Sequence, residues 1–278
     1  MIANTARRVQ CRGRELELGK RTLIMGILNV TPDSFSDGGS YISRDAALRQ
    51  AYQMAEDGAD IIDIGGESTR PNHQRVEADE ELRRVLPVIE AIHREIPLPI
   101  SIDTYKPHVA QRALEAGAHM INDIWGCRLD RKMADVAAAF EAPIALMHNR
   151  PDMQYTDFVP DVLDDLKESI RIALEAGVHE SAIILDPGIG FAKTRAHNLE
   201  LMNRLSEVCR LGYPVLLGTS RKSFIQHVLD SPAADVIEGT AATVALGIAQ
   251  GCEIMRVHDV RQMKRVALMC DAIVRGEA

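Results

Sequence analysis

The chain has 278 residues, a formal net charge of -8, and 46% hydrophobic and 26% charged residues. This length suits one large domain or two ordinary ones, and the composition is that of a globular protein. The negative charge disfavours nucleic acid as a partner, since proteins that bind it usually present a basic face. No apolar run approaches the roughly 20 residues of a membrane span, and the opening MIANTARRVQ lacks the apolar core of a secretion signal.

The cysteine pattern argues against a disulfide framework and against a structural zinc site. The five cysteines are an odd number, widely spaced, and none forms a CxxC pair. They are Cys11, Cys127, Cys209, Cys252 and Cys270. We expect most of them to be small core residues in a reducing compartment, and the protein to be a cytoplasmic enzyme.

Eight short apolar runs alternate with longer amphipathic stretches along the chain. The runs are near-continuous in apolar residues, as in parallel strands that are covered on both faces. The predicted strands are 22–30, 60–66, 99–105, 120–125, 143–148, 182–188, 214–220 and 253–259. The predicted helices are 45–57, 78–95, 106–116, 131–140, 160–176, 197–209, 233–250 and 260–274. In the segments EDGAD, EAGA and EAGV, a glycine at the end of a helix predicts a left-handed cap.

The eightfold strand-helix alternation predicts an α/β fold, a single-domain (β/α)8 TIM barrel over residues 22–278. Residues 1–21 precede the first strand, and we expect this short N-terminal extension to form a small hairpin under the barrel. A doubly wound parallel sheet is the alternative architecture.

Every predicted strand ends on polar residues. Because a barrel brings the carboxyl ends of its strands to one face, these side chains should meet there. They are Asn29; Glu67, Thr69 and Arg70; Asp103; Asn122 and Asp123; His148 and Asn149; Asp186; Ser220, Arg221, Lys222 and Ser223; and Arg256, His258 and Asp259. Any one of them alone could equally cap a turn or a helix.

The mixture of side chains indicates a polar heterocycle joined to a phosphate. Asp103, Asn122 and Asp186 suit a flat ring edge with hydrogen-bond donors and acceptors. Basic residues follow other strands, and TIM barrels often bind phosphate after strands seven and eight. These basic residues are Arg70, Lys222, Arg256 and His258.

Evidence for a metal is limited to one residue. No HxH, HExxH or carboxylate cluster at ligand spacing occurs. Asn29 could hold Mg2+ together with substrate phosphate oxygens and water, or it could simply end its strand. His148 is interpreted as structural. The remaining histidines considered, which we interpret as loop or surface residues, are His73, His93, His108 and His119.

Seven motifs, in this order, resemble those of the dihydropteroate synthase family. They are GILNVTPDSFSDGG, DIIDIGGESTRP, SIDTY, INDIWG, ILDPGIGF, GTSRKSF and MRVHDV, and they run from Gly26 to Val260. The resemblance implies a barrel enzyme of folate biosynthesis. Such an enzyme joins (7,8-dihydropterin-6-yl)methyl diphosphate to 4-aminobenzoate and releases diphosphate and 7,8-dihydropteroate. The family is a sulfonamide target, and its members are usually homodimers.

The resemblance also implies the roles of individual residues. The pterin diphosphate site would comprise Thr69, Arg70, Asp103, Asn122, Asp186, Lys222, Arg256 and His258. The 4-aminobenzoate site would comprise Phe35, Thr69, Pro71, Phe191 and Ser223. The catalytic set would be Asp37, Asp103, Lys222, Arg256 and His258, with Asn29 as a ligand of Mg2+.

The family's reaction is dissociative, so the resemblance implies a lid that excludes water from a pterin-methyl cation. The loop after the first strand would supply it, with Phe35 over the arylamine and Asp37 near the reaction centre. Gly38 and Gly39 would act as its hinge.

The chain departs from the family pattern at two places on the 4-aminobenzoate side. Asn72 follows STRP where a glycine is expected, with His73 and Arg75 close behind. Ala192 stands in GFAK where GFGK is expected.

Two other functions share this fold. A corrinoid-dependent methyltransferase has a similar pterin pocket, but it needs no diphosphate site. A non-catalytic pterin-binding paralogue would lose Asn29, Asp37 or Arg256, and all three are present here.

For the homodimer, the apolar segments ATVALGIAQG and VALMCDAIV in the last two predicted helices are candidates for a shared face. They could equally pack on the barrel.

Overall fold

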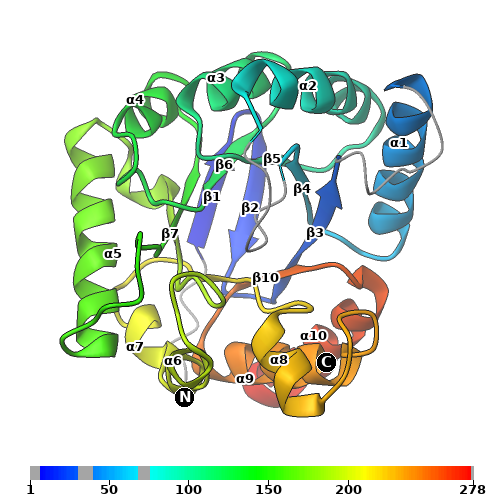
Figure 1. Cartoon of the computed structure of the whole chain (residues 1–278). Coiled ribbons are helices and arrows are strands. Elements are labelled where there is room, and N and C mark those ends of the chain that lie inside the picture. Colours follow the sequence, from blue (N-terminus) through cyan, green and yellow to red (C-terminus); the bar gives the residue numbers. More distant parts are fainter. Residues whose placement is uncertain (1–6, 31–39, 68–75, 277–278) are drawn as a thin grey trace.

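Eight parallel strands form the centre of the protein in the computed structural model, which describes residues 7–30, 40–67 and 76–276 (Figure 1). The strands are β3 (Leu23–Asn29), β4 (Ile61–Gly65), β5 (Ile100–Asp103), β6 (Met120–Asp123), β7 (Ile144–Met147), β8 (Ile183–Asp186), β9 (Leu216–Leu217) and β10 (Ile254–Val257). Their order is β8-β7-β6-β5-β4-β3-β10-β9, and a parallel bridge from Leu185 to Val215 joins the two edges. The predicted TIM barrel is confirmed.

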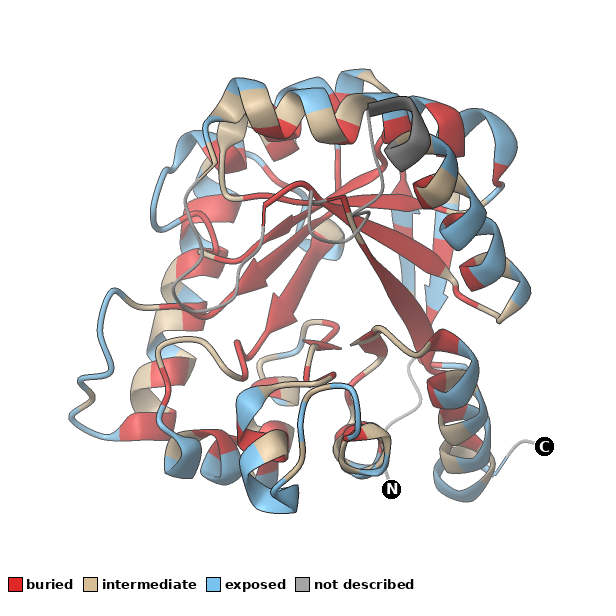
Figure 2. Cartoon of the chain, turned by 45° about the vertical axis from the view of Figure 1, so that its right-hand side comes forward, coloured by how far each residue is buried: buried red, intermediate tan, exposed pale blue. Residues whose placement is uncertain are grey.

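Helices surround the sheet and cover the outer face of the strands (Figure 1). They are α1 (Ser40–Glu56), α2 (Ala78–Glu95), α3 (Pro107–Glu115), α4 (Lys132–Ala139), α5 (Phe158–Glu175), α6 (Arg195–Asn203), α7 (Leu205–Cys209), α8 (Ser223–Leu229), α9 (Ile237–Gln250) and α10 (Val260–Arg275), with a short 3-10 turn η2 (Glu180–Ala182). Figure 2 shows buried strands at the centre and helices that are buried on one side and exposed on the other. That pattern is what amphipathic helices against a barrel require.

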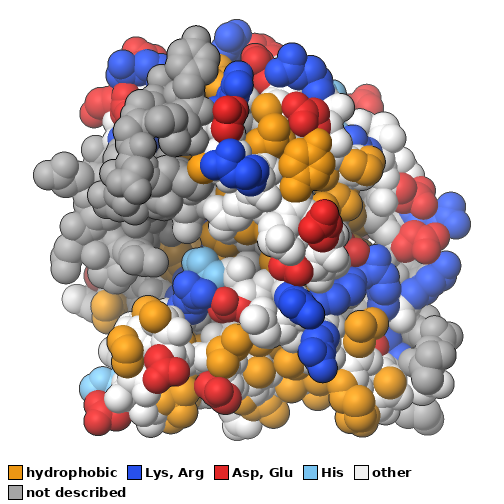
Figure 3. All heavy atoms as spheres, turned by 90° about the vertical axis from the view of Figure 1, so that its right-hand side faces the viewer, with side chains coloured by type: hydrophobic (Ala, Val, Ile, Leu, Met, Phe, Trp, Pro, Cys, Tyr) orange, Lys and Arg blue, Asp and Glu red, His pale blue; other side chains and the backbone are white. Residues whose placement is uncertain are grey.

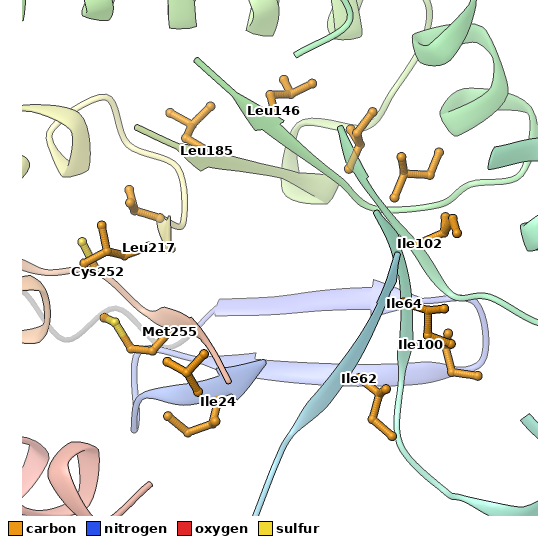
Figure 4. Packing of buried hydrophobic residues seen from close by; sticks show 14 of the residues in the cluster. Ile24, Ile62, Ile64, Ile100, Ile102, Leu146, Leu185, Leu217, Cys252 and Met255 are labelled. Carbon is orange, nitrogen blue, oxygen red and sulfur yellow. The ribbon is translucent and has the colours of Figure 1, made fainter. Parts of the chain in front are cut away.

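Side chains alternate between the outside and the inside of the barrel, because successive residues of a strand point to opposite faces. Ile62, Ile64, Ile100 and Ile102 belong to the outer core together with helix residues, and Figure 4 shows them on neighbouring strands. Ile61 belongs instead to a second cluster, inside the barrel. Asp63, two residues after Ile61, therefore shares this inner face.

A β-hairpin closes the amino-terminal end of the barrel. It is formed by β1 (Arg7–Cys11) and β2 (Arg14–Leu18). Its apolar residues pack against the first inward residues of the strands in one cluster: Val9, Cys11, Leu16, Leu18, Leu23, Met25, Ile61, Met120, Ala145, Ile184, Leu216 and Ile254. At the hairpin turn, Arg12 donates to the carbonyls of Leu114 and Ala118 at 2.7 and 2.5 Å. The open end of the barrel is therefore the end where the strands finish.

The element boundaries differ from the expectation on both sides of the seventh barrel strand, β9. The helix expected over 197–209 is two helices, α6 and α7, because Arg204 leaves helical geometry at φ -117 and ψ 19. The strand expected over 214–220 is regular only at Leu216–Leu217, and the additional helix α8 follows it.

Three local predictions have clear outcomes. The glycine caps are confirmed, since Gly58, Gly117 and Gly177 have φ of 93, 113 and 96. The surface interpretation of His119 is wrong: the residue is buried, and its Nδ1 accepts from the backbone N–H of Ile100 at 3.0 Å. Among the described helices, none is long and apolar enough to cross a membrane.

Candidate active site

A layer of polar side chains lies directly above the apolar floor, inside the barrel. Each comes two residues after a floor residue on its strand and so points inward as well. These side chains are Asp63, Asn122, Asp186 and Arg256, after Ile61, Met120, Ile184 and Ile254. Asp103 ends β5, where it pairs in register with Gly65 on one side and with Asn122 on the other.

Arg256 lies between two buried carboxylates. Its Nε is 2.6 Å from Asp63 Oδ2, and its Nη2 is 2.6 Å from Asp103 Oδ2. Asn122 also donates to Asp63 Oδ2, at 3.3 Å. Burial opposes the charge of Arg256, but the two carboxylates outweigh it and raise the pKa of the guanidinium. The guanidinium therefore stays charged within the polar layer.

Two carboxylate oxygens in this group are buried and have no hydrogen-bond partner among the described residues. They are Asp63 Oδ1 and Asp103 Oδ1. An unsatisfied buried acceptor costs about 1–3 kcal/mol, so a ligand that donates here gains affinity. Burial raises the pKa of Asp103 to about 7, against the pull of Arg256 and with a further rise from Asp63.

Asp186, in the polar layer, and Lys222, at the start of α8, form another charged pair of side chains in the site. Asp186 ends β8, and its Oδ1 accepts from the backbone N–H of Gly188 at 2.7 Å. Burial raises the pKa of Asp186. The ammonium of Lys222 lies 4.1 Å from the ring centroid of Phe191. Burial lowers the pKa of Lys222 to about 8, while Asp186 acts to raise it.

The loop after β9 is tied to the end of β10. Arg221, held at φ 58, makes a two-point ion pair with Asp259 at 2.6 and 3.1 Å. His258 Nδ1 lies 3.0 Å from Ser220 Oγ, and the backbone N–H of His258 donates to the same oxygen at 3.2 Å. These ties place Lys222, at the start of α8, next to the strand that carries Arg256 and His258.

Asn29 lies at the mouth, at the end of β3. Its Oδ1 and Asp103 Oδ2 are each 3.7 Å from the position that a Cβ on Gly65 would take, so the two side chains flank the same glycine. Within the described parts of the chain, no group of three or more His, Cys, Asp or Glu could hold a metal. Asn29 offers one oxygen, which suits Mg2+ because this ion usually keeps several waters and binds substrate phosphates.

Comparison with known proteins decides the family. The family described as pterin binding enzyme matches residues 25–258. Dihydropteroate synthase of Bacillus subtilis (strain 168) is 61% identical over 259 residues, which cover 93% of this chain and 91% of the relative. The chain belongs to the dihydropteroate synthase family of pterin-binding enzymes.

Solved structures of dihydropteroate synthases have the same fold. The Clostridium difficile protein, crystallised in the presence of pteroic acid, has a TM-score of 0.92 and 52% identity, with 94% of this chain and 99% of that chain covered. The Xanthomonas albilineans protein with 4-aminobenzoic acid has a TM-score of 0.92 and 42% identity, with 97% and 98% covered. The resemblance to the dihydropteroate synthase family is confirmed.

Ala192, which replaces a glycine expected in the family, has a left-handed backbone. Its φ is 46, a region that costs a residue with a Cβ roughly 1–2 kcal/mol. Its carbonyl accepts from the hydroxyl of Tyr155 at 2.8 Å, which holds this conformation. The backbone geometry explains why glycine suits the position.

Several predicted residues lie outside the described part of the chain, so their roles remain predictions. They are Phe35, Asp37, Gly38 and Gly39 in the first loop, and Thr69, Arg70, Pro71, Asn72, His73 and Arg75 in the second. The described residues bring together Asp103, Asn122, Asp186, Lys222 and Arg256. His258, Asn29, Phe191 and Ser223 lie around them, at the mouth.

Sequence reasoning missed three ionisable residues near the site. Asp63 was hidden inside an apolar strand, although a lone carboxylate in such a run is itself a signal. Lys106 pairs with both Glu67 and Glu81 at the base of the second loop. Lys193 is buried at the end of the loop after β8. The motif GFAK, in which it stands, does not indicate that a lysine there is buried.

A groove of about 1140 Å³ lies on the side of the barrel where the strands end. The loops after β5, β6, β7 and β8 line it, with Trp125, Leu129, Met153 and Phe191 among its apolar residues. The buried carboxylates do not line it. Phe191 lines the groove, and its ring also faces the ammonium of Lys222.

Proposed function

We propose that this chain condenses (7,8-dihydropterin-6-yl)methyl diphosphate with 4-aminobenzoate, forming 7,8-dihydropteroate and diphosphate. The observation that carries the proposal is the layer of four buried side chains, Asp63, Asp103, Asn122 and Asp186, around the part-buried Arg256, in which Asp103 Oδ1 has no donor among the described residues. A pterin edge supplies adjacent N–H and amino donors, which match such acceptors. The ligands in the two solved structures, pteroic acid and 4-aminobenzoic acid, support the same reaction.

The pterin would lie over the floor of the barrel. Asp186 would accept from its amino group and ring N–H, and Asp103 and Asn122 would bind neighbouring ring positions. Lys222 would donate to the acceptor atoms on the other side. In this pose the ring would pair with most of the buried polar side chains and replace the water there.

The diphosphate would lie at the mouth, near the ends of β10 and β3. Arg256 would supply positive charge, and Arg256 and His258 would donate hydrogen bonds to its oxygens, which strengthen as the leaving group gains charge. The Asn29 oxygen fits Mg2+, with diphosphate and water as the other ligands. Bound Mg2+ would neutralise part of the leaving-group charge.

The arylamine would stack on Phe191, with its carboxylate toward Ser223 at the start of α8. We assign Phe35, Thr69 and Pro71 to the same subsite. The carbon–oxygen bond to diphosphate breaks first, and the arylamine nitrogen then bonds to the methylene carbon and loses a proton. Asp37 would approach the reaction centre as the first loop excludes water.

The test is a product assay with purified protein, the pterin diphosphate, 4-aminobenzoate and Mg2+, scored for 7,8-dihydropteroate by mass spectrometry.

Asp186→Asn, which keeps the shape but removes the charge, should lose pterin binding in calorimetry. Removal of Mg2+ with EDTA should stop turnover, and added Mg2+ should restore it. Wild-type protein that binds the pterin but makes no product would instead be a non-catalytic pterin-binding protein.

We also propose a homodimer that forms through α9 and α10. Leu246, Leu268, Met269 and Ile273 on these helices are 55–70% exposed. On the face of the molecule seen in Figure 3, apolar side chains gather along the lower edge, at the height at which Figure 1 places α8, α9 and α10. Burial of each such side chain in an interface contributes about 1.5–3 kcal/mol.

For its location we propose the cytoplasm. The five cysteines are all free thiols, as is usual in a reducing compartment.

A further inference from the structure

Lys193 is a buried lysine that the proposed chemistry does not use. Its side chain is 6% exposed, and its ammonium has three partners. Two are carbonyls of its own loop, Gly188 O at 2.8 Å and Phe191 O at 3.1 Å. The third is His148 Nδ1, at 2.8 Å, at the end of β7. The loop after β8 is therefore folded around this ammonium.

The tautomer of His148 determines what Lys193 must supply. His148 Nε2 lies 3.1 Å from Asp165 Oδ2, and Asp165 is ion-paired with Arg150 and Arg128 at 2.6 and 3.0 Å. Burial works against its charge, but His148 and Arg150 outweigh it and hold the pKa of Asp165 well below its usual range. An ionised Asp165 accepts a hydrogen bond from Nε2–H, so His148 carries its ring hydrogen on Nε2 and Nδ1 is left as an acceptor. Burial lowers the pKa of Lys193 to about 7, and in its charged form the three N–H groups of the ammonium match these three acceptors.

The same loop presents the substrate-facing residues. The backbone N–H of Gly188 donates to Asp186 Oδ1 at 2.7 Å, while its carbonyl accepts from Lys193. The carbonyl of Phe191 also accepts from Lys193, and its ring faces the ammonium of Lys222. Lys193 thus holds Phe191 directly and reaches Asp186 through Gly188.

We propose that Lys193 is a positioning residue, which fixes the loop 187–193 to His148 so that Asp186 faces the pterin and Phe191 faces the arylamine. The inference rests on the proposed function for the identity of the two ligands. It adds a three-residue support, Lys193, His148 and Asp165, behind the pocket wall. Affinity for both substrates should depend on this support, although none of the three touches them.

Lys193→Met tests the proposal, because it keeps the length of the side chain and removes all three donors. The Kd for the pterin diphosphate, measured by calorimetry without 4-aminobenzoate, should rise at least tenfold. The KM for 4-aminobenzoate should rise at least fivefold, while kcat stays within about threefold of wild type. Lys264→Met is the matched control, since it removes a part-buried lysine that is bonded to Asp60 at 3.2 Å, at the amino-terminal end of the barrel. It should lower Tm but leave Kd and KM within twofold.

A Lys193→Met protein that melts like the control and binds both ligands within twofold of wild type would overturn the proposal. If that variant does not fold, Asp165→Asn decides. Its amide can donate to Nε2 and turn Nδ1 into a donor facing Lys193, so the Kd for the pterin diphosphate should rise at least threefold. An unchanged Kd would overturn the proposal as well. Wild-type protein that forms no dihydropteroate would reject the proposed function instead, since that outcome does not depend on Lys193.

Discussion

At the scale of single residues, Asp63 governs the polar layer without facing the mouth. It is fully buried, and one of its oxygens accepts from both Arg256 and Asn122. Loss of its charge would leave Arg256 with only Asp103 as a paired carboxylate, and Asn122 without an oriented acceptor. Breaking a buried ion pair by removing one partner costs about 3–5 kcal/mol.

Asp63→Asn should therefore lower the free energy of unfolding by about 3–5 kcal/mol and lower kcat/KM by about 100-fold, since a few kcal/mol of lost positioning corresponds to such a factor. Urea unfolding and steady-state kinetics measure the two effects. Asp60→Asn is the matched control, because Asp60 is also ion-paired, with Arg21 and Lys264, but at the opposite end of the barrel. Similar losses of kcat/KM in both variants would contradict a specific role for Asp63.

The pH dependence of the pocket follows from two displaced pKa values. Burial raises the pKa of Asp103 to about 7 and lowers the pKa of Lys222 to about 8. As pH rises, Asp103 loses its proton near 7 and can then only accept hydrogen bonds, and Lys222 loses its charge near 8. We expect kcat/KM to be bell-shaped, with its maximum between these values. Lys222→Arg should remove the alkaline limb, and a limb that persists unchanged would assign it to another group.

The strand-end residues were predictable from the sequence because a parallel barrel fixes where strands end. Asp103, Asn122, Asp186 and Arg256 lie together as that rule requires. Asp63 and Lys193 were not predictable in the same way. Asp63 lies inside a strand. The burial of Lys193 depends on how the loop 187–193, which contains Gly188 and Gly190, folds back on the end of β7. Tertiary contacts decide such positions, and hydrophobic periodicity does not report them.

At the scale of elements, the loop after β8 depends on one close approach of two backbones. A Cβ on Gly188 would lie 1.9 Å from the carbonyl oxygen of His148, and its φ is 68. Gly188→Ala should cost at least about 2 kcal/mol, from the left-handed backbone and the steric overlap together. Gly212→Ala is the control, since φ is 94 there but nothing lies within 4 Å. Urea unfolding of the two variants separates overlap from backbone strain, and equal losses would contradict the close approach.

The element boundaries could be predicted where local chemistry sets them. Gly58, Gly117 and Gly177 end their helices as the sequence indicates, because glycine takes positive φ at little cost. The break at Arg204 and the short β9 were not predictable, since no Gly or Pro marks the break and apolar residues continue through the strand. Packing against neighbouring elements determines both.

At the scale of the whole molecule, the period-two pattern of the strands explains how one fold serves two purposes. Outward isoleucines such as Ile62 and Ile64 join the helices to the sheet, while inward residues build first a floor and then a polar pocket. The hairpin β1–β2 covers the floor, so in the described part of the chain the polar interior faces the end where the strands finish. Stability is thereby concentrated at one end of the barrel, and the other end is left for chemistry.

The exposed face of α9 and α10 leads to a prediction about assembly. The wild-type chain of 30.7 kDa should sediment at about twice that mass. The double variant Leu268→Glu and Ile273→Glu should sediment as a monomer, because it places charges where two apolar faces would meet. Leu174→Glu, on the exposed side of α5, is the control and should leave the mass unchanged. A wild-type monomer, or a double variant with the mass of the wild type, would show that these helices are not the shared face.

Because the active-site side chains described here come from one chain, the monomeric variant should keep its affinity for the pterin diphosphate, which calorimetry can check alongside the mass.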